Sequence, residues 1–152
     1  MSAYQIYYHV NWCTLERRPM IDAAARDFLE AYLRRVAARE RVEVLALGIL
    51  RTHLHVVIRT GPRCDLARLV QYWKGGSSHS IGRLPGNPLG LRWSAEYAVS
   101  TVSPASLNRA IRYVKTQELR HPDEAITARS DRSAFRIGTT RASRPASWSR
   151  SP

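Results

Sequence analysis

The sequence is poor in cysteine and has no long apolar run. Its two cysteines, Cys13 and Cys64, form neither a disulfide framework nor a zinc-ligand spacing, and they fit a reducing compartment. No apolar stretch approaches the roughly 20 residues needed to cross a bilayer, and the N-terminus lacks the apolar segment of a signal peptide. We therefore expect a cytoplasmic protein with no membrane partner.

Acidic residues are also scarce. There are 12 Asp and Glu against 24 Lys and Arg, which gives a formal net charge of +12 and a pI near 10.8. Such an excess favours a polyanionic partner, and nucleic acid is the leading candidate. The sequence has no Gly-rich phosphate-binding loop of the Gly-x-x-x-x-Gly-Lys-Ser/Thr type and no acidic cluster for a two-metal nuclease. It therefore predicts no nucleotide cofactor.

Hydrophobic patterning predicts four strands and three helices in one domain, residues 1–126. The strands are expected over 4–13, 42–50, 53–59 and 95–102, and the helices over 22–41, from 65 onward and over 103–121. Paired glycines, Gly75 and Gly76, weaken the second helix where they occur. The order predicts an α+β sandwich, in which a mainly antiparallel sheet has helices on one face. Residues 127–152 carry six arginines and six serines and predict a disordered basic tail.

Two pairs of polar residues could take part in metal binding or catalysis. His53 and His55 alternate in an expected strand, so both rings point to one face and could bind a metal. A structural or accidental pair explains them at least as well. Tyr113 and Gln117 are four residues apart in the expected third helix and project from nearly the same side. On their own, a half-buried aromatic and a surface polar residue are the simpler explanation.

A series of motifs supports a functional interpretation of both pairs, because the motifs occur in the order found in one protein family. The motifs are YHVNW at 8–12 with RRP at 17–19, HLH at 53–55, KGGSS at 74–78, RWSAEY at 92–97 with STV at 100–102, and YVKTQ at 113–117. Through them, residues 4–121 resemble the single-tyrosine HUH transposases of small bacterial insertion sequences, the IS200-like transposases. These are related to the REP-associated tyrosine transposases.

The resemblance implies a fold and a site. The fold would be an RNA-recognition-motif or ferredoxin-like sandwich, with the nucleophile Tyr113 on a C-terminal helix. His53, His55 and Gln117 would bind Mg²⁺ or Mn²⁺. Members of the family often have Asp before the first histidine. This chain has Thr52 there, which we expect to tune the site without changing its ligands.

The resemblance also implies a reaction and a substrate. Tyr113 would attack a phosphate of single-stranded DNA, form a 5′-phosphotyrosine link and release a 3′-OH, so that rejoining needs no ATP. The substrate would be DNA hairpins at element ends. The protein would act as a homodimer. The helix that carries Tyr113 would either pack on its own subunit or be exchanged with the partner subunit. The expected DNA-contacting residues are Arg17, Arg18, Lys74, Ser77, Ser78 and Arg92, although a helix-end cap explains the two serines as well.

Two other functions remain open. One is a domesticated, non-catalytic nucleic-acid-binding module, which would not need all four of His53, His55, Tyr113 and Gln117. The other is a nuclease for hairpin DNA of the REP-associated type, which shares the first chemical step. For the remaining aromatic and histidine residues we expect structural or surface positions: Trp12, Trp73 and Trp93 in a core or interface, His9 beside a neighbouring strand, and His79 and His121 at the surface.

Overall fold

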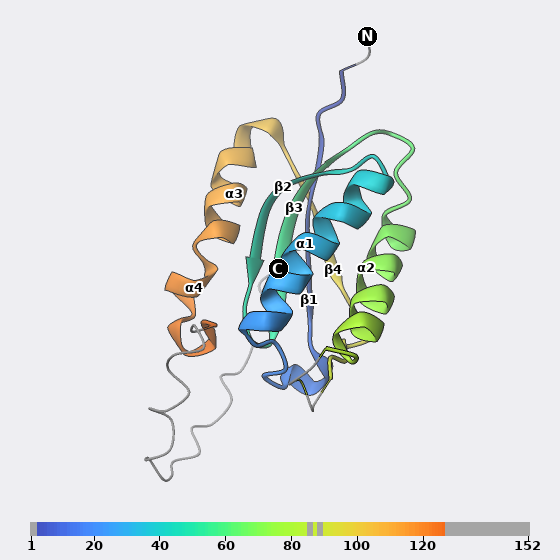
Figure 1. Ribbon diagram of the computed structural model, residues 1–152. Coiled ribbons are helices and arrows are strands. Elements are labelled where there is room, and N and C mark those ends of the chain that lie inside the picture. The colour runs from blue at the N-terminus through green and yellow to red at the C-terminus, as the bar shows by residue number, and fades with distance from the viewer. Residues whose placement is uncertain (1–2, 85–86, 88–89, 127–152) are drawn as a thin grey trace.

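A four-stranded antiparallel sheet forms the centre of the protein (Figure 1). The computed structural model describes residues 3–84, 87 and 90–126. The predicted tail, residues 127–152, lies outside this part of the chain. The sheet has the order β2-β3-β1-β4, and its strands are β1 Ile6–Cys13, β2 Glu43–Ile49, β3 His53–Thr60 and β4 Ala98–Val102. The predicted α+β class and antiparallel sheet are confirmed.

The helices begin where polar caps predict. Asp22 accepts a hydrogen bond from the Ala25 amide at 2.8 Å, and Asp65 accepts one from the Arg68 amide at 3.0 Å. Ser103 caps the turn that opens at Pro104. The α-helices are α1 Ala23–Arg39, α2 Leu66–Ile81, α3 Leu107–Lys115 and α4 Gln117–Arg120. Short 3₁₀ turns are η1 Leu15–Arg17, η2 Pro104–Ser106 and η3 Pro122–Glu124.

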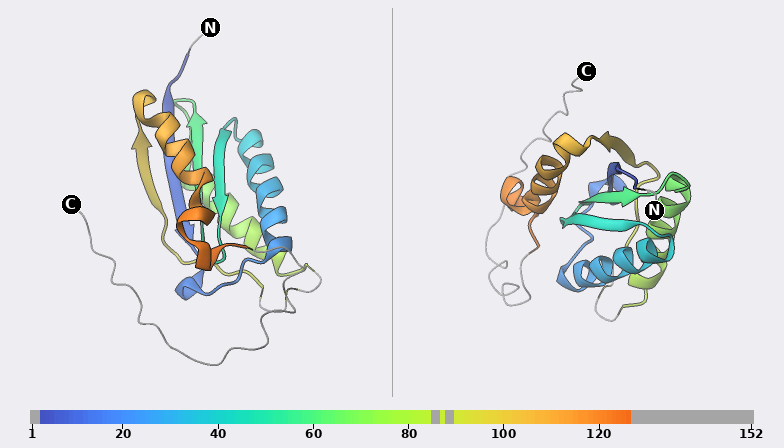
Figure 2. Two further views of the ribbon diagram at one scale, coloured as in Figure 1. Left: turned by 90° about the vertical axis from the view of Figure 1, so that its left-hand side faces the viewer. Right: turned by 90° about the horizontal axis from the view of Figure 1, so that it is seen from above.

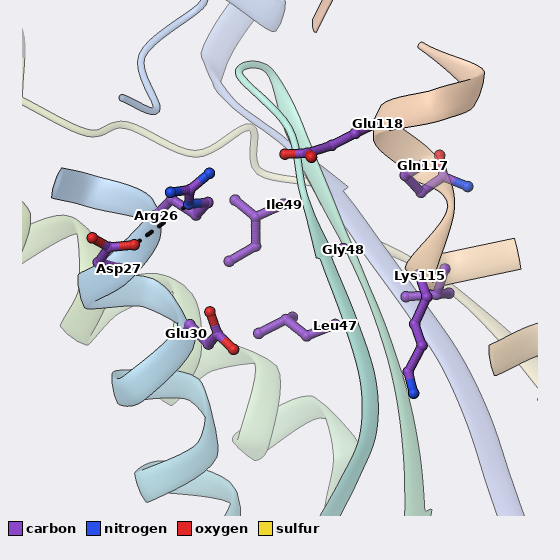
Figure 3. A pocket seen from close by; sticks show the side chains of 10 residues that line it. Arg26, Asp27, Glu30, Leu47, Gly48, Ile49, Lys115, Gln117 and Glu118 are labelled. Carbon is purple, nitrogen blue, oxygen red and sulfur yellow. Dashed lines mark hydrogen bonds and ion pairs between the residues drawn. The ribbon is translucent and has the colours of Figure 1, made fainter. Parts of the chain in front are cut away.

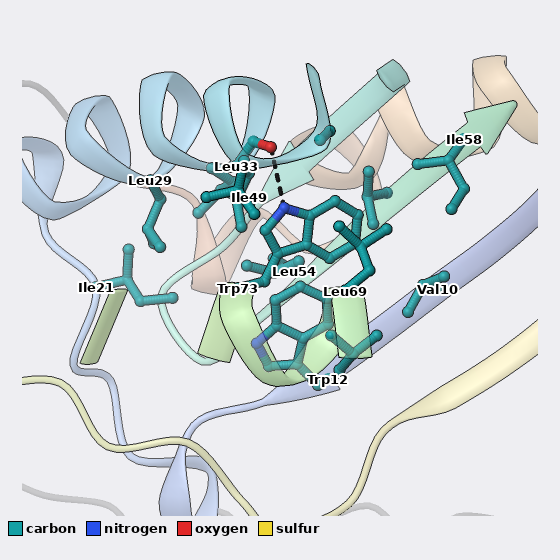
Figure 4. Packing of buried hydrophobic residues seen from close by; sticks show 14 of the residues in the cluster. Val10, Trp12, Ile21, Leu29, Leu33, Ile49, Leu54, Ile58, Leu69 and Trp73 are labelled. Atoms are coloured by element: carbon teal, nitrogen blue, oxygen red, sulfur yellow. Dashed lines mark hydrogen bonds between the residues drawn. The ribbon is translucent and has the colours of Figure 1, made fainter. Parts of the chain in front are cut away.

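The main core lies between the sheet and helices α1 and α2. Leu54 and Val56 point into it from β3, as the alternation in the sequence predicts. Trp12 and Trp73 stack there with ring centroids 5.8 Å apart, and the Trp73 indole donates to the Leu33 carbonyl at 3.0 Å (Figure 4). The expected burial of both tryptophans is confirmed. This core fixes which face of β3 remains for His53 and His55.

Helix α3 lies on the opposite face of the sheet, so the helices do not all lie on one face as expected (Figure 2). A smaller core joins buried Val114 of α3 to Ala46 of β2 and Val57 of β3. Apolar side chains at Leu107, Ala110 and Ile111 pack around it. The sheet is therefore covered on both sides, and α3 shares a face with the two histidines of β3.

The expected third helix is interrupted at Thr116. There the Gln117 side-chain amide donates to the Tyr113 carbonyl at 2.9 Å, and the Thr116 hydroxyl donates to the Arg112 carbonyl at 2.8 Å. Side-chain bonds of this kind compete with regular helical bonds. Tyr113 therefore belongs to α3, whereas Gln117 begins α4.

Helix α2 continues through Gly75 and Gly76, contrary to the expected weakening. At Gly76 a glycine is needed, because a Cβ there would lie 1.6 Å from the Tyr32 hydroxyl. That hydroxyl donates to the Tyr72 carbonyl at 3.1 Å and holds α1 against α2. Within the described residues, no helix is long and apolar enough to span a membrane.

The two glycines of α2 give a matched test of this packing. We expect Gly75→Ala to raise the free energy of unfolding by about 0.5–1 kcal/mol, because alanine favours the helix and a Cβ meets nothing there. Gly76→Ala should lower it, because Tyr32 must move away. Urea unfolding of both variants measures this. Equal stabilisation by both substitutions would show that Tyr32 yields without cost.

Candidate active site

Three histidine rings gather on the face of the sheet that carries α3. His53 and His55 lie on β3, with ring centroids 5.2 Å apart. His9, from the neighbouring strand β1, stacks on His55 at 5.1 Å. His121, just after α4, lies with its ring centroid 5.9 Å from that of His53. The expected pairing of His53 and His55 on one face is confirmed, and the fold adds two further histidines.

Each β3 histidine uses Nδ1 for its contacts within the protein. His55 Nδ1 lies 2.9 Å from His9 Nε2. His53 Nδ1 lies 2.9 Å from both Glu124 Oε2 and the Thr52 hydroxyl. Among the described residues, no hydrogen-bond partner takes Nε2 of either ring. Both Nε2 atoms therefore remain for a metal ion or another ligand.

Tyr113 stands beside these rings. Its ring centroid lies 5.8 Å from that of His55 and 5.9 Å from that of His9, in both cases edge-on. The residue is 37% exposed, so part of it can be reached from solvent. The Arg120 guanidinium lies 5.0 Å from the ring centroid and adds a positive charge next to the phenol. The site thus places a partly exposed tyrosine beside His55 and His9 within one chain.

Gln117 is almost fully buried at 1% exposure. Its amide nitrogen donates to the Tyr113 carbonyl, whereas its Oε1 is buried with no hydrogen-bond partner within the described structure. Its side chain packs over Gly48 of β2, the residue paired with His55 in the sheet. An unpartnered buried carbonyl oxygen is costly and indicates that a further partner is needed.

Burial keeps the imidazoles neutral. It lowers the pKa of His55 to about 3, and the nearby positive charges of His53, His9, His121 and Arg17 act in the same direction. The pKa of His53 is also lowered, chiefly by burial, although the Glu124 carboxylate opposes this. Burial also lowers the pKa of His9. Neutral imidazoles are the form that binds a metal.

The residues present fit a divalent metal ion. Two neutral rings offer free Nε2 atoms, and Gln117 offers a buried oxygen without a partner. No group of three or more His, Cys, Asp or Glu in the described ranges could hold a metal ion. A metal at this site would therefore need a ligand of another kind, and Gln117, which packs over the strand residue paired with His55, is the candidate.

A polar hollow of about 320 Å³ also borders Gln117, between α1, β2 and α4 (Figure 3). Its lining carries both signs of charge, with Arg26, Asp27 and Glu30 on α1 and Glu118 on α4. Tyr113 and the described histidines are not part of that lining. We therefore place the candidate site at the histidine face and not at this hollow.

Three of the expected DNA-contacting residues, Lys74, Ser77 and Ser78, form hydrogen bonds with the segment 91–96. The Lys74 ammonium donates to the Ser94, Ala95 and Glu96 carbonyls at 2.6, 3.1 and 3.3 Å. Ser77 is fully buried and accepts a hydrogen bond from the Trp93 indole at 2.9 Å. Ser78 donates to the Leu91 carbonyl at 2.6 Å. The KGGSS and RWSAEY motifs are therefore packed together, and Ser77 has no surface to offer a phosphate.

The three expected arginines lie near one another around η1. Arg18 and Arg92 line a hollow of about 350 Å³ together with Leu15, Pro19 and Met20. Arg17 has a left-handed backbone, with φ of 53°, and lies close enough to act on the pKa of both His53 and His55. Arg17 therefore lies near the histidines, whereas Arg18 and Arg92 share the hollow next to η1.

Sequence comparison agrees with this geometry. The family described as "Transposase IS200 like" matches residues 2–117, most of the chain. The chain belongs to the IS200-like transposase family. Members of this family are DNA-cutting enzymes of transposition and are generally metal-dependent. The match includes His53, His55, Tyr113 and Gln117.

Individual relatives support the same assignment. The ISDra2 transposase TnpA of Deinococcus radiodurans is 26% identical over 122 residues, covering 75% of this chain and 85% of the relative. A crystal structure of a D. radiodurans R1 protein assigned as a transposase has a TM-score of 0.58 at 24% identity, over 76% of this chain and 93% of the other. A REP-associated tyrosine transposase bound to a REP hairpin has a TM-score of 0.63 at 16% identity, over 80% of this chain and 74% of the other.

The sequence did not single out His9, His121 or Glu124 as site residues. His9 lies inside the YHVNW motif, and its alternation with Val10 could have placed it on the histidine face. His121 and Glu124 follow the last motif, and the local pattern carries no signal for them. Their positions depend on how the chain turns back after α4.

The neutral histidines make the stability of the metal-free protein depend on pH. Unfolded His55 takes up a proton near its ordinary pKa of 6.5, whereas folded His55 does so near 3. We therefore expect the free energy of unfolding to fall as pH drops from about 6.5 toward 3. One such proton contributes at most about 1.4 kcal/mol per pH unit. Urea unfolding across this range should give a smaller slope for His55→Gln, and equal slopes would contradict the assignment.

Close packing of α3 on β2 depends on Gly48. A Cβ at this position would lie 2.3 Å from the Val114 carbonyl oxygen, a backbone atom that no side-chain rotation can move. We expect Gly48→Ala to lower the free energy of unfolding by about 1–3 kcal/mol and to speed amide hydrogen exchange in α3. Gly61→Ala is the control, because a Cβ there meets nothing. Unchanged exchange in α3 would show that the contact is dispensable.

Proposed function

We propose that the protein cuts and rejoins single-stranded DNA through a covalent link to Tyr113, with a divalent metal ion on His53, His55 and Gln117. One observation carries this proposal. A partly exposed tyrosine lies edge-on to His55, one of a buried histidine pair whose two Nε2 atoms have no hydrogen-bond partner among the described residues. Membership in the IS200-like family supports the same reading.

The proposed reaction is the one that the resemblance to single-tyrosine transposases implies. The Tyr113 oxygen forms a bond to phosphorus and loses its proton, while the bond from phosphorus to the 3′ oxygen breaks and that oxygen takes up a proton. The phosphodiester becomes a 5′-phosphotyrosine link, which a new 3′-OH can attack without ATP. A bound Mg²⁺ or Mn²⁺ would supply Lewis-acid stabilisation of the phosphate oxygens. Arg120, whose guanidinium lies beside the Tyr113 ring, would attract the phosphate.

Hairpin-forming DNA is the proposed substrate. The net charge of +12 supplies attraction to phosphates. Arg17 lies near the histidines, and Arg18 and Arg92 line the hollow next to η1. A structural neighbour bound to a REP hairpin has the same fold, which makes this class of DNA the first to test. Lys74 and Ser78 would reach DNA only by leaving their carbonyl partners.

The tyrosine helix packs on the sheet of its own chain in this arrangement. We propose that Tyr113 acts with the histidines of the same subunit in this state. Dimer formation would then bring two complete sites together, and exchange of the helix would require breaking the contact between Val114 and Gly48.

The first test is formation of the covalent intermediate. Incubation with labelled single-stranded hairpin DNA from the flanks of the gene, with Mn²⁺ or Mg²⁺, should give a protein–DNA band on a denaturing gel. Tyr113→Phe should abolish the band, because phenylalanine has no nucleophilic oxygen. Tyr72→Phe is the matched control, since Tyr72 is 44% exposed but lies on α2, away from the histidine face.

The outcomes separate the candidate functions. A metal-dependent band that Tyr72→Phe keeps and Tyr113→Phe loses supports a strand transferase or a hairpin nuclease, and rejoining to a second strand distinguishes the two. Tight binding to several hairpins with no band in either metal would support a non-catalytic binding module instead. A band that survives in Tyr113→Phe would assign the nucleophile to another residue.

A further inference from the structure

Glu124 lies beyond the residues matched by the family and contacts one of the two histidines directly. Its carboxylate oxygen Oε2 lies 2.9 Å from His53 Nδ1 and accepts a hydrogen bond from the Thr52 hydroxyl at 2.7 Å. The Thr52 oxygen also lies 2.9 Å from His53 Nδ1. Glu124, Thr52 and His53 thus form a closed three-membered network at the edge of the candidate site.

The proton positions in this network follow from its donors and acceptors. An ionised carboxylate can only accept, and the single Thr52 hydroxyl proton is donated to it. Both partners of His53 Nδ1 therefore offer lone pairs, so Nδ1 must carry the proton. In a neutral imidazole the other nitrogen, Nε2, then has the lone pair that a metal ion needs.

Backbone contacts hold the network in place. The Arg51 amide, in the turn between β2 and β3, donates to the Glu124 carbonyl at 3.0 Å. Two residues further on, Ile126 is 7% exposed and packs into the main core. The Thr52 backbone is also held, because its carbonyl accepts a hydrogen bond from the Thr14 amide at 2.7 Å. The return of the chain after α4 therefore fixes the carboxylate against the start of β3.

We propose that Glu124, together with Thr52, is a positioning residue that fixes the tautomer and orientation of His53, so that its Nε2 is available to the divalent metal ion. The role rests on the proposed function, because it presupposes a metal on His53. It also gives Thr52 a function at the position that precedes the first histidine. Glu124 acts through His53 and does not contact the metal, because its carboxylate occupies the opposite side of the ring.

The experiment compares the full-length chain with Glu124→Gln, which keeps the shape of the side chain but can donate as well as accept. Asp123→Asn is the matched control, since Asp123 is the exposed acidic neighbour on the same turn η3. Mn²⁺ affinity is measured by calorimetry, and the His53 tautomer is read in the metal-free proteins by ¹⁵N NMR. Melting temperatures show whether each variant is folded. If Glu124→Gln does not fold, Glu124→Asp is measured in its place.

We expect Glu124→Gln to weaken Mn²⁺ binding by about 10- to 100-fold, the usual effect of losing such an outer partner. We also expect loss of the uniform Nδ1-protonated tautomer of His53. Asp123→Asn should behave as wild type in both measurements. Thr52→Val should shift the tautomer in the same direction by a smaller amount.

Two results would overturn the proposal. Wild-type Mn²⁺ affinity in Glu124→Gln, with binding lost in His53→Ala, would show a metal site that does not need Glu124. An unchanged tautomer with weakened binding would make Glu124 a metal ligand itself. Failure of the proposed function looks different, because His53→Ala and wild type would then bind Mn²⁺ equally. The tautomer measurement still tests Glu124 in that case.

Discussion

The contact between α3 and the edge strand β2 is the constraint on which the site depends. Gly48 lets the Val114 carbonyl approach the strand more closely than any side chain would allow. That approach closes the smaller core of Ala46, Val57 and Val114 and brings Tyr113 beside His55. The same contact lays Gln117 over Gly48 and buries it. Tyr113, the histidines and the Gln117 amide are therefore brought together by one packing contact on the face opposite the main core.

Strand register supplies the rest of the geometry. His55 is paired with Asn11 of β1 on one side and with Gly48 of β2 on the other. His9 is two residues from Asn11 and so lies diagonally across from His55 on the same face, where its ring stacks on that of His55. Leu54, Val56 and Ile58 anchor the other face in the main core. A slip of one residue in β3 would turn the histidines into the main core beside the tryptophans and turn Leu54 toward the face covered by α3.

Much of this could be predicted from the sequence, because it depends on local periodicity. Alternation in β3 predicted a shared face for the histidines, and the caps Asp22, Asp65 and Ser103 predicted the helix starts. The apolar stripe of the third helix did not reveal which side of the sheet it would cover, because a stripe specifies burial and not the partner. The break at Thr116 arises from side-chain bonds to carbonyls, which helical periodicity does not include. Lys74, Ser77 and Ser78 form hydrogen bonds with residues 13 to 22 positions away in the sequence, contacts that only the tertiary fold defines.

The two histidines have chemically different outer partners, and this difference has consequences. His53 faces a carboxylate and a hydroxyl, which both accept, so its proton has one possible position. His55 faces another imidazole, His9, which can either donate or accept. The proton of that pair can therefore lie on either ring, and ligation of His55 through Nε2 would fix it on Nδ1, directed at His9. Burial under α3 lowers the pKa of all three rings and keeps them neutral. Burial thus maintains the protonation state in which the histidines can bind a metal.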